Sequence, residues 1–328
     1  MAETLVTIVR RLADGEYCSG EALAELCGIS RAAVWKQIER LRQHYGLPVE
    51  ASQGKGYRLP YPLELLDEDR ILAELSPQGR FLLQHLELLF EVDSTNRYLT
   101  DARAQGAQGG QACFAEFQSA GRGRRGRPWV SPLAGNIYLS LLWEYPLGPA
   151  RLSGLSLVAG LAVARTLRRF GARRVGLKWP NDVLWQGRKL AGLLLEVQGE
   201  QEGPSQLVLG LGVNLCIPAE AGRDIDQPWV DLREVLGEAE PIPRNLLCAK
   251  LLDELLIALA HFEVEGLGPQ LEEWQHYDVY FGRPITLRLG DREVAGVHRG
   301  IDPSGALILQ DQAGEQRLYH GGEVSLRG

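Results

Sequence analysis

The amino-acid sequence predicts an α+β protein of more than one domain, and three observations support this prediction. The chain has 328 residues, which is too long for one ordinary hydrophobic core, so two or three domains are expected. Helical and strand patterns mix between about residues 65 and 268, as in an α+β sheet domain. Residues 271–328 are instead rich in strand and turn signals, which predicts a small barrel.

Composition and charge narrow the class of protein further. The chain is 45% hydrophobic and 23% charged, with a formal net charge of −7, so any nucleic-acid binding must be confined to part of its surface. Its five cysteines lack a C-x-x-C spacing, which argues against a disulfide framework or a zinc site. The amino terminus lacks a secretory pattern, and the apolar residues 155–164 span only about half a bilayer. We therefore predict a cytoplasmic protein with no membrane partner.

The first sixty residues predict a helix, a tight turn, a second helix and a hairpin. Ser19 can cap the first helix, Gly28 permits the turn, and Ser30 can cap the second helix. Residues 47–60 then predict two strands around a Gly-Lys-Gly turn, with Lys55 at its tip. Together these elements form the pattern of a winged helix-turn-helix.

The second helix of this pair would present a small and basic face to its surroundings. Val34, Ile38 and Leu41 share the opposite face, which we expect to be buried. An ordinary helical hairpin with a solvated face fits this pattern too, but the wing and the four basic groups against one acid in residues 30–43 favour DNA binding. The candidate DNA-binding residues are Ser30, Arg31, Ala32, Lys36, Arg40 and Lys55.

The central segment follows a linker marked by Pro60 and Pro62. A helix is predicted to start at Asp93 or Ser94, because either side chain could cap it. Residues 152–170 predict a long, buried apolar helix. The predicted strands are residues 111–117, 136–143, 175–179, 189–197 and 206–215, and the later turn signals are residues 290–291, 302–305 and 312–314.

The loop "GRGRRGRPWVSP", residues 121–132, lies between the first two of these strands. Its glycines satisfy G-x-G-x-x-G, but a proline follows instead of a helix, which excludes a dinucleotide-binding motif. A basic nucleic-acid arm would more often lie at a terminus or on an exposed helix. We favour anion capture, in which glycines give mobility and arginines supply charge and paired donors, although Arg125 or Arg127 could instead pair with a nearby acid.

Four further motifs supply polar groups suited to a phosphate-bearing small molecule. "KWPND" at residues 178–182 places a cation, an amide and a carboxylate at a strand end, and "GRKLAG" brings Lys189 to a turn. "DSTN" at residues 93–96 gathers small donors at a helix start, and "GLGVN" ends a buried strand at Asn214. The sequence holds no Walker A, H-E-x-x-H or G-x-S-x-G motif, so the common ATPase, zincin and hydrolase templates do not apply.

These motifs, in this order behind a winged helix, resemble the bacterial bifunctional biotin–protein ligase and biotin-operon repressor family. The resemblance covers essentially the whole chain, including "RGIDPSGALIL" and "GGEVSLR" near its end. It implies a winged helix-turn-helix DNA-binding domain at residues 1–62, an α+β catalytic domain with a mixed sheet at residues 66–268, and a small SH3-like β-barrel at residues 271–328. One departure is Ala134, followed by Gly135, where the family usually has glycine two residues after the Ser-Pro of the loop.

The resemblance also implies a reaction in two steps. The biotin carboxylate attacks the α-phosphate of ATP, with Mg²⁺ assisting, and a lysine of the biotin carboxyl carrier protein of acetyl-CoA carboxylase then takes biotin from biotinyl-5′-AMP. The implied biotin-binding residues are Ser94, Thr95, Asn96, Gln118, Arg122, Gly123, Arg124 and Lys189. The implied adenylate-side residues are Trp129, Lys178 and Asn214, and the catalytic residues are Lys189, Arg124 and Asp182.

The role of Asp182 and the function as a whole leave alternatives open. Asp182 is the candidate base for the incoming lysine, but it could instead cap the turn at Pro180 or contact Mg²⁺ or adenosine. No Mg²⁺ ligand is assigned. The resemblance further implies that bound biotinyl-AMP favours a homodimer, which presents two winged helices to operator DNA. The alternatives are a monofunctional ligase, a ligand-sensing repressor without catalysis, and a lipoate ligase, against which the arginine-rich loop argues.

Overall fold

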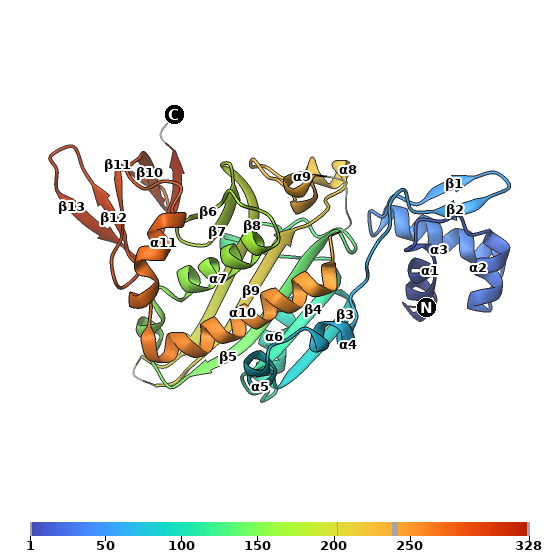
Figure 1. The fold of residues 1–328 in the computed structure, drawn as a ribbon, viewed down its shortest axis with the longest axis horizontal. Coiled ribbons are helices and arrows are strands. Elements are labelled where there is room, and N and C mark those ends of the chain that lie inside the picture. Colours follow the sequence, from blue (N-terminus) through green and yellow to red (C-terminus); the bar gives the residue numbers. More distant parts are fainter. Residues whose placement is uncertain (1, 202, 238–241, 327–328) are drawn as a thin grey trace.

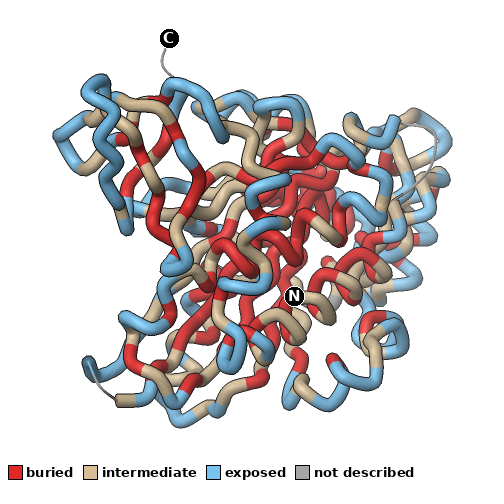
Figure 2. Tube along the Cα trace, turned by 60° about the vertical axis from the view of Figure 1, so that its left-hand side comes forward, coloured by how far each residue is buried: buried red, intermediate tan, exposed pale blue. Residues whose placement is uncertain are grey.

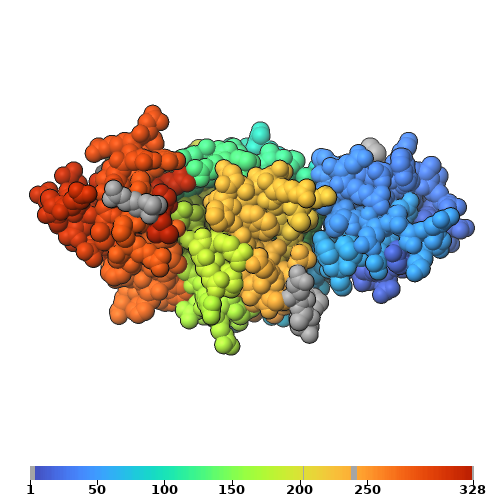
Figure 3. Space-filling model, turned by 90° about the horizontal axis from the view of Figure 1, so that it is seen from above, coloured from blue at the N-terminus to red at the C-terminus, as the bar shows by residue number. Residues whose placement is uncertain are grey.

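The computed structural model describes residues 2–201, 203–237 and 242–326. The chain forms three bodies in a row, with the N-terminal helices at one end and a C-terminal sheet at the other (Figure 1). The same order is visible from above, where the surface passes from the N-terminal body through the central body to the C-terminal body (Figure 3). The predicted α+β multidomain architecture is confirmed.

The N-terminal body is a winged helix. Its elements are α1 (Ala2–Leu12), α2 (Gly20–Cys27), α3 (Arg31–Gln43), β1 (Glu50–Ser52) and β2 (Gly56–Arg58). The Ser19 and Ser30 hydroxyls cap α2 and α3 by accepting hydrogen bonds from backbone N–H groups. Gly28 ends α2 in a left-handed conformation with φ 63°, as the turn requires. These three sequence predictions are confirmed.

The central body is built on a mixed sheet of seven strands. The strands are β3 (His85–Val92), β4 (Gln111–Gln118), β5 (Asn136–Tyr145), β6 (Val175–Lys178), β7 (Asp182–Trp185), β8 (Arg188–Gly199) and β9 (Ser205–Asn214). Their order is β3-β4-β5-β9-β8-β7-β6, and only β3 and β4 run parallel. Strands β3 and β7 are not among the predicted ones, because β7 is only four residues long and the mixed apolar and acidic residues of β3 do not discriminate strand from helix.

Two long helices cover one face of this sheet and a shorter helix covers the other. Helices α7 (Leu155–Arg169) and α10 (Arg244–Glu265) pack with alternate strand residues into the main core (Figures 1 and 2). Helix α6 (Thr95–Ala104) packs on the opposite face, where Leu99 contacts a separate cluster. By length and composition alone the segment Pro149–Arg169 is long enough to cross a membrane, but most of it is buried in the protein, as predicted for a core helix.

The remaining helices are short. They are α4 (Glu68–Ala73) and α5 (Pro77–Leu82), which pack on α10, together with α8 (Ala219–Gly222), α9 (Leu232–Leu236) and α11 (Leu271–Tyr277). The prediction that a side chain caps α6 is wrong. Ser94 holds the cap position without a side-chain hydrogen bond, and Asp93 accepts from the Ser94 N–H instead. Ser94 is among the residues that line a cavity.

The C-terminal body is a five-stranded antiparallel sheet. Its strands are β10 (Pro284–Leu289), β11 (Arg292–Ile301), β12 (Leu307–Gln310), β13 (Gln316–Tyr319) and β14 (Glu323–Leu326), in the order β13-β12-β11-β10-β14. The predicted turns at residues 290–291, 302–305 and 312–314 join successive strands. This body meets the central sheet where the Val279 N–H donates to the Leu177 carbonyl at 3.0 Å, beside the end of β6.

The end of α3 contacts the central sheet directly. The Tyr45 hydroxyl donates to Glu91 of β3 at 2.7 Å, and its ring packs against Phe117 of β4. Burial and the neighbouring Glu91 raise the pKa of Tyr45 to about 12. Burial raises the pKa of Glu91, but hydrogen bonds from His44 and Tyr45 outweigh it and hold that pKa below its ordinary value. The winged helix is therefore joined to the strand that leads into the "DSTN" motif.

We expect Tyr45→Phe to loosen this junction by about 1 kcal/mol, because the Glu91 carboxylate loses a half-buried hydrogen bond. The measurement is the rate of proteolytic cleavage in the linker at residues 60–64, which should rise about fivefold. Tyr17→Phe is the matched control, since Tyr17 lies in the same body and contacts Lys55 and Arg58 through its ring, which phenylalanine keeps. Equal cleavage of the two variants would contradict the prediction.

Candidate active site and DNA-reading surface

A cavity with two chambers lies where the arginine loop, β8, β9 and the start of α6 meet. The first chamber encloses about 960 Å³ including its open mouth, and the second about 650 Å³. Of the predicted residues, the first chamber is lined by Ser94, Thr95, Asn96, Gln118, Arg122, Gly123, Arg124, Trp129, Lys178, Asp182 and Lys189. The second is lined by Asn214, and both share Trp129 and Lys189. The structure thus brings these residues together, while their individual roles stay predictions.

The first chamber is strongly cationic although the whole chain is acidic. Six lining side chains are cationic and two are acidic, for a difference of +4: Arg122, Arg124, Arg125, Arg127, Lys178 and Lys189 against Asp182 and Glu323. Positive groups gathered in a concave site raise the local concentration of an anion. This charge pattern fits the anion-capture interpretation of the loop.

The inner end of the first chamber, beside the start of α6, is a largely buried hydrogen-bond network, in which the Asn96 amide also donates to the Glu196 carboxylate at 2.8 Å. Gln118 accepts hydrogen bonds from the Thr95 N–H at 2.9 Å and from its hydroxyl at 3.1 Å. Ser140 lies 2.8 Å from the Thr95 hydroxyl and 2.6 Å from the Asn96 amide oxygen. Ser140 has no exposed surface and was not among the predicted residues, since a serine inside a buried strand carries no local signal of function. The network can hold a small polar ring by donors and acceptors of fixed direction.

Two glycines of β9 make room for this site. A Cβ atom on Gly210 would lie 2.1 Å from the Asn96 amide oxygen, and one on Gly212 would lie 2.4 Å from the Trp129 indole. Both glycines face the chamber because residues two apart on a strand share a face. The sequence motif "GLGVN" pointed to Asn214, but its two glycines explain why Asn96 and Trp129 fit against the strand.

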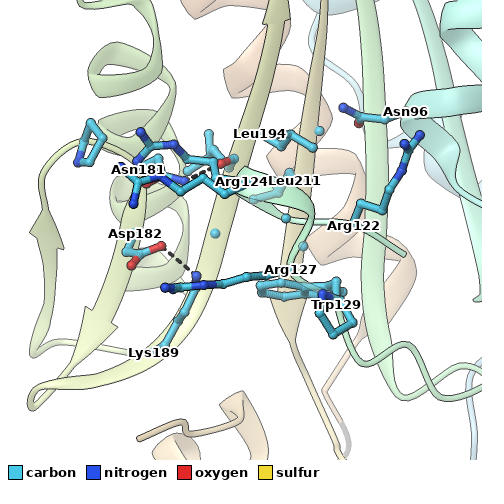
Figure 4. A pocket seen from close by; sticks show the side chains of 18 of the residues that line it. Asn96, Arg122, Arg124, Arg127, Trp129, Asn181, Asp182, Lys189, Leu194 and Leu211 are labelled. Carbon is cyan, nitrogen blue, oxygen red and sulfur yellow. Dashed lines mark hydrogen bonds and ion pairs between the residues drawn. The ribbon is translucent and has the colours of Figure 1, made fainter. Parts of the chain in front are cut away.

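The arginine loop folds back on itself over the chamber. The Gly123 N–H donates to the Arg127 carbonyl at 2.8 Å, and the Trp129 N–H donates to the Gly121 carbonyl at 2.9 Å. Arg124 donates to the Asn181 amide oxygen at 3.0 Å (Figure 4), and burial lowers the pKa of its guanidinium. The loop and the "KWPND" turn therefore meet across the cavity.

The outer side of the loop is tied to the C-terminal sheet. Arg127 forms a paired hydrogen bond with Glu323 of β14, at 2.7 and 2.9 Å, and Arg125 lies 3.7 Å from the same carboxylate. The hydrogen bonds from Arg127 lower the pKa of Glu323. The sequence analysis allowed Arg125 or Arg127 to pair with an unnamed acid, and that acid is Glu323. Sequence patterns did not identify Glu323, because Arg127 lies 196 residues away from it.

Lys189 stands at the junction of the two chambers. Its ammonium lies 2.7 Å from the Asp182 carboxylate and 5.4 Å from the centre of the Trp129 ring (Figure 4). Asp182 also lies 3.6 Å from the Lys178 ammonium, and all three charged side chains are largely buried. An ammonium that is held between two chambers can contact a group from each of them.

The second chamber is closed by a segment that pairs with the start of β8. The Val230 N–H donates to the Lys189 carbonyl at 3.0 Å, and the Trp229 ring forms part of the wall. The Asn214 amide donates to the carbonyls of Lys189 and Val230 at 3.2 and 3.1 Å, so it fastens this segment to the sheet. Trp229 was not predicted, because it lies in an irregular segment without a recognisable motif.

The predicted DNA-binding residues fall into two groups. Arg31, Ala32 and Lys36 are exposed on α3, and Lys55 lies at the tip of the wing, while the Ser30 hydroxyl is used as the cap of α3. Arg40 differs from these, because it donates to the Tyr45 hydroxyl at 3.0 Å and lies 3.6 Å from Glu91. Its guanidinium takes part in the contact between α3 and the sheet, whatever it contributes to DNA binding.

The backbone accommodates Ala134 at the position where the family usually has glycine. Ala134 adopts a left-handed conformation with φ 51°, a region that glycine enters at less cost, and its N–H donates to the Glu116 carbonyl at 2.8 Å. The path from the arginine loop into β5 is therefore the one that a glycine would allow.

Comparison with known proteins assigns each of the three bodies to a family model. An HTH domain matches residues 4–58, the Biotin/lipoate A/B protein ligase family matches residues 89–214, and the Biotin protein ligase C terminal domain matches residues 280–327. The bifunctional ligase/repressor BirA of Salmonella typhimurium is 45% identical over 100% of this chain and 99% of its own length. The protein of the same name from Escherichia coli is 44% identical over 98% of this chain and 96% of its own length.

A solved structure supports the same assignment. The biotin protein ligase from Aquifex aeolicus, in complex with biotin and ATP, matches with a TM-score of 0.62 and 30% identity. The match covers 75% of this chain and 99% of that chain. That ligase therefore corresponds to about three quarters of the present chain.

Proposed function

Because the chain belongs to the biotin protein ligase family, as a bifunctional ligase and repressor, we propose how its residues divide the two activities. The protein is an ATP-dependent biotin ligase that acts on a carrier protein, and its winged helix binds DNA. In the proposal the first chamber receives biotin and the second receives the adenosine part of ATP. The observation that carries this division is the position of Lys189, whose side chain lines both chambers.

Biotin would lie with its polar ring at the inner end of the first chamber. Ser94, Thr95, Asn96 and Gln118 offer hydroxyl and amide groups there, and their buried network holds them in fixed directions. Its carboxylate would then point toward the cationic end, where Arg122, Gly123 and Arg124 of the loop and Lys189 lie. This orientation brings the reacting oxygen to the boundary between the chambers.

Adenylation would take place at that boundary. The biotin carboxylate attacks the α-phosphate and pyrophosphate leaves, while the Lys189 ammonium stabilises the charge that grows on the phosphoryl oxygens. Trp129, Lys178 and Asn214 are the proposed residues of the adenylate side. Arg124, which bridges the loop to Asn181, would keep the loop closed so that water does not reach the mixed anhydride.

Mg²⁺ would enter with ATP. Among the residues that the structure describes, no three His, Cys, Asp or Glu side chains form a group that could hold a metal. This fits an ion held mainly by phosphate oxygens and water, with one or two carboxylates. Asp224 and Asp226 line the second chamber and are the proposed carboxylates. The ion would offset negative charge on the phosphates.

Transfer to the carrier needs a base for the incoming lysine ammonium. Asp182 is the proposed base, because its carboxylate lies within the cavity beside Lys189. Once the lysine ε-amine is neutral, it attacks the acyl carbon of biotinyl-AMP, the amide bond forms, and AMP leaves with the electrons of the broken C–O bond. The partner we propose for this step is the biotin carboxyl carrier protein of acetyl-CoA carboxylase.

Repression would follow when this acceptor is scarce. Biotinyl-AMP then stays bound, and we propose that it favours a cytoplasmic homodimer that presents two winged helices to a two-fold operator. By linkage, operator DNA must tighten adenylate-dependent dimerisation by the same factor that the adenylate tightens DNA binding. A gel shift on the promoter of the biotin genes, with and without biotin and ATP, separates this repressor from a ligase whose winged helix has no regulatory role.

The ligase assignment is tested by mass spectrometry of a carrier domain incubated with the protein, biotin and MgATP. A biotin-sized mass gain is expected, and omission of ATP should abolish it. Lipoate in place of biotin should give no gain. If an acceptor-competent carrier gains no mass with biotin and MgATP, the proposed function is wrong.

We expect Glu323→Ala to open the arginine loop and to speed the release of biotinyl-AMP. The Arg127–Glu323 pair is partly exposed and worth up to about 1 kcal/mol, so release should rise about fivefold. Arg127 lowers the pKa of Glu323, so the contact is complete above the usual carboxyl range and is lost as pH falls through the lowered value. Glu315→Ala, which removes an exposed acid from the turn before β13 of the same body, is the control, and equal release rates would refute the prediction.

A further inference from the structure

Trp35 is an exposed aromatic residue on α3, the second helix of the helix-turn-helix pair and the proposed reading helix. Its side chain is 54% exposed, although a tryptophan of a folded domain is usually well buried. Within the described part of the chain it makes no hydrogen bond, ring contact or cation contact and is absent from the core of the winged helix. The fold of this domain therefore does not account for it.

The position of Trp35 on α3 places it among the exposed residues that face outward. It lies one helical turn after Arg31 and three residues after Ala32, and residues at these spacings are neighbours on a helix surface. Val34, Ile38 and Leu41 point the other way and are fully buried. Ala32 is small, so the helix backbone can approach a bound surface closely on the side where the indole projects.

The chemistry of the bound surface follows from these neighbours. Arg31 and Lys36 carry charge suited to phosphate groups, whereas the indole of Trp35 carries none. In the major groove, the apolar group that a base edge offers is the thymine methyl, and small or aromatic side chains contact it. Trp35 also lies in the N-terminal half of α3, the part of a reading helix that reaches base edges.

We propose that Trp35 reads a thymine by packing its indole against the thymine methyl group in the major groove. The inference rests on the proposed DNA-binding function and deepens it, because it names a base that the site must contain. Basic side chains around Trp35 would position the helix on phosphates, and Trp35 would then select the sequence.

The experiment begins with selection of binding sites from a random duplex library by the full-length protein with biotin and MgATP. Each thymine of the selected site is then replaced by deoxyuridine, which removes only the methyl group. For the wild-type protein, one particular thymine in each half-site should matter. Replacing it in a single half-site should weaken binding about fourfold, the factor for one lost apolar carbon group of about 0.8 kcal/mol. Replacement in both half-sites should weaken binding about fifteenfold.

Variants decide whether Trp35 makes this contact. Trp35→Ala should bind thymine and deoxyuridine sites equally well, and Trp35→Phe should keep part of the discrimination. Lys36→Ala should instead weaken binding to every site about equally and leave the deoxyuridine effect intact. Phe81→Ala is the matched control, because Phe81 is also an exposed aromatic residue (80%) but lies on α5, outside the winged helix. An unchanged melting temperature of Trp35→Ala shows that the variant is folded.

Two results would overturn the proposal, and they are distinguishable. If Trp35→Ala keeps the same thymine-over-deoxyuridine preference as the wild type, Trp35 does not read the methyl group, while DNA binding stands. If the wild-type protein enriches no sequence at all from the library, the DNA-binding function itself fails and the role of Trp35 fails with it.

Discussion

Lys189→Ala is expected to slow the formation of biotinyl-AMP by a factor of about 10² to 10³, the usual loss when one group that stabilises transition-state charge is removed. In the proposed arrangement the ammonium, which lines both chambers, would face the carboxylate and the phosphate only when both substrates are bound. Its effect should therefore fall on the rate of the chemical step more than on the binding of biotin alone. Pre-steady-state quenching with labelled ATP measures this rate directly.

The design of this experiment must separate lost catalysis from a disturbed site. Removing Lys189 leaves the largely buried Asp182 with Lys178 as its remaining cationic neighbour, at 3.6 Å. Because Lys178 still balances that carboxylate, Lys189→Ala should melt within a few degrees of the wild type but form the adenylate slowly. A rate of adenylation within fivefold of the wild type in Lys189→Ala would mean that another group stabilises the transferred phosphoryl charge.

Glu116→Ala is expected to destabilise the central body by about 3–5 kcal/mol, because it leaves a buried guanidinium without its counter-charge. Arg244 at the start of α10 is 2% exposed and donates to Glu116 of β4 at 2.5 Å. It also donates to the Asn136 carbonyl at 2.9 Å and to the Glu64 carbonyl of the linker at 3.1 Å. Glu116 in turn accepts from the Leu66 N–H, so this one pair joins the linker, the sheet and α10.

Chemical unfolding followed by hydrogen exchange in β4 and β5 measures this loss in the central body alone. Glu254→Ala is the control, because Glu254 also lies on α10 and pairs with Arg169, but that arginine is 64% exposed and the pair should contribute less than about 1 kcal/mol. The double variant Glu116→Leu/Arg244→Met should recover most of the stability, since it leaves no buried charge. Equal stability of Glu116→Ala and Glu254→Ala would show that Arg244 finds other compensation.

Local patterns in the sequence predicted the local structure well. Ser19 and Ser30 cap their helices, and Gly28 ends the first of them, because a cap depends on residues only three positions apart. The side-chain cap that the sequence predicted at the start of α6 does not form. Ser94 fills the cap position as expected, but its hydroxyl forms no cap hydrogen bond, and the residue lines the cavity.

The composition of the arginine loop and the order of the motifs also predicted a cationic site suited to a phosphate-bearing molecule. The loop, "KWPND", Lys189 and "DSTN" converge on one cavity, because each motif lies at an end of a strand of the central sheet or of a helix that packs on it. Residues with no motif of their own were missed. Ser140 and Trp229 belong to this group, since neither a serine within a strand nor a tryptophan in an irregular segment marks a site.

The sequence by itself determined the order of the bodies, the helix-turn-helix pair with its two serine caps, the buried apolar helix, the turns of the C-terminal sheet and the type of ligand that the cationic loop suits. Only the tertiary structure decided that Glu323 holds Arg127, that Glu91 receives Tyr45 and that Glu116 neutralises Arg244. The physical reason is the separation along the chain between the residues that interact. Propensity and periodicity act over one or two turns of chain, whereas these partners lie 196, 46 and 128 residues apart and meet only when the sheet and its covering elements have packed.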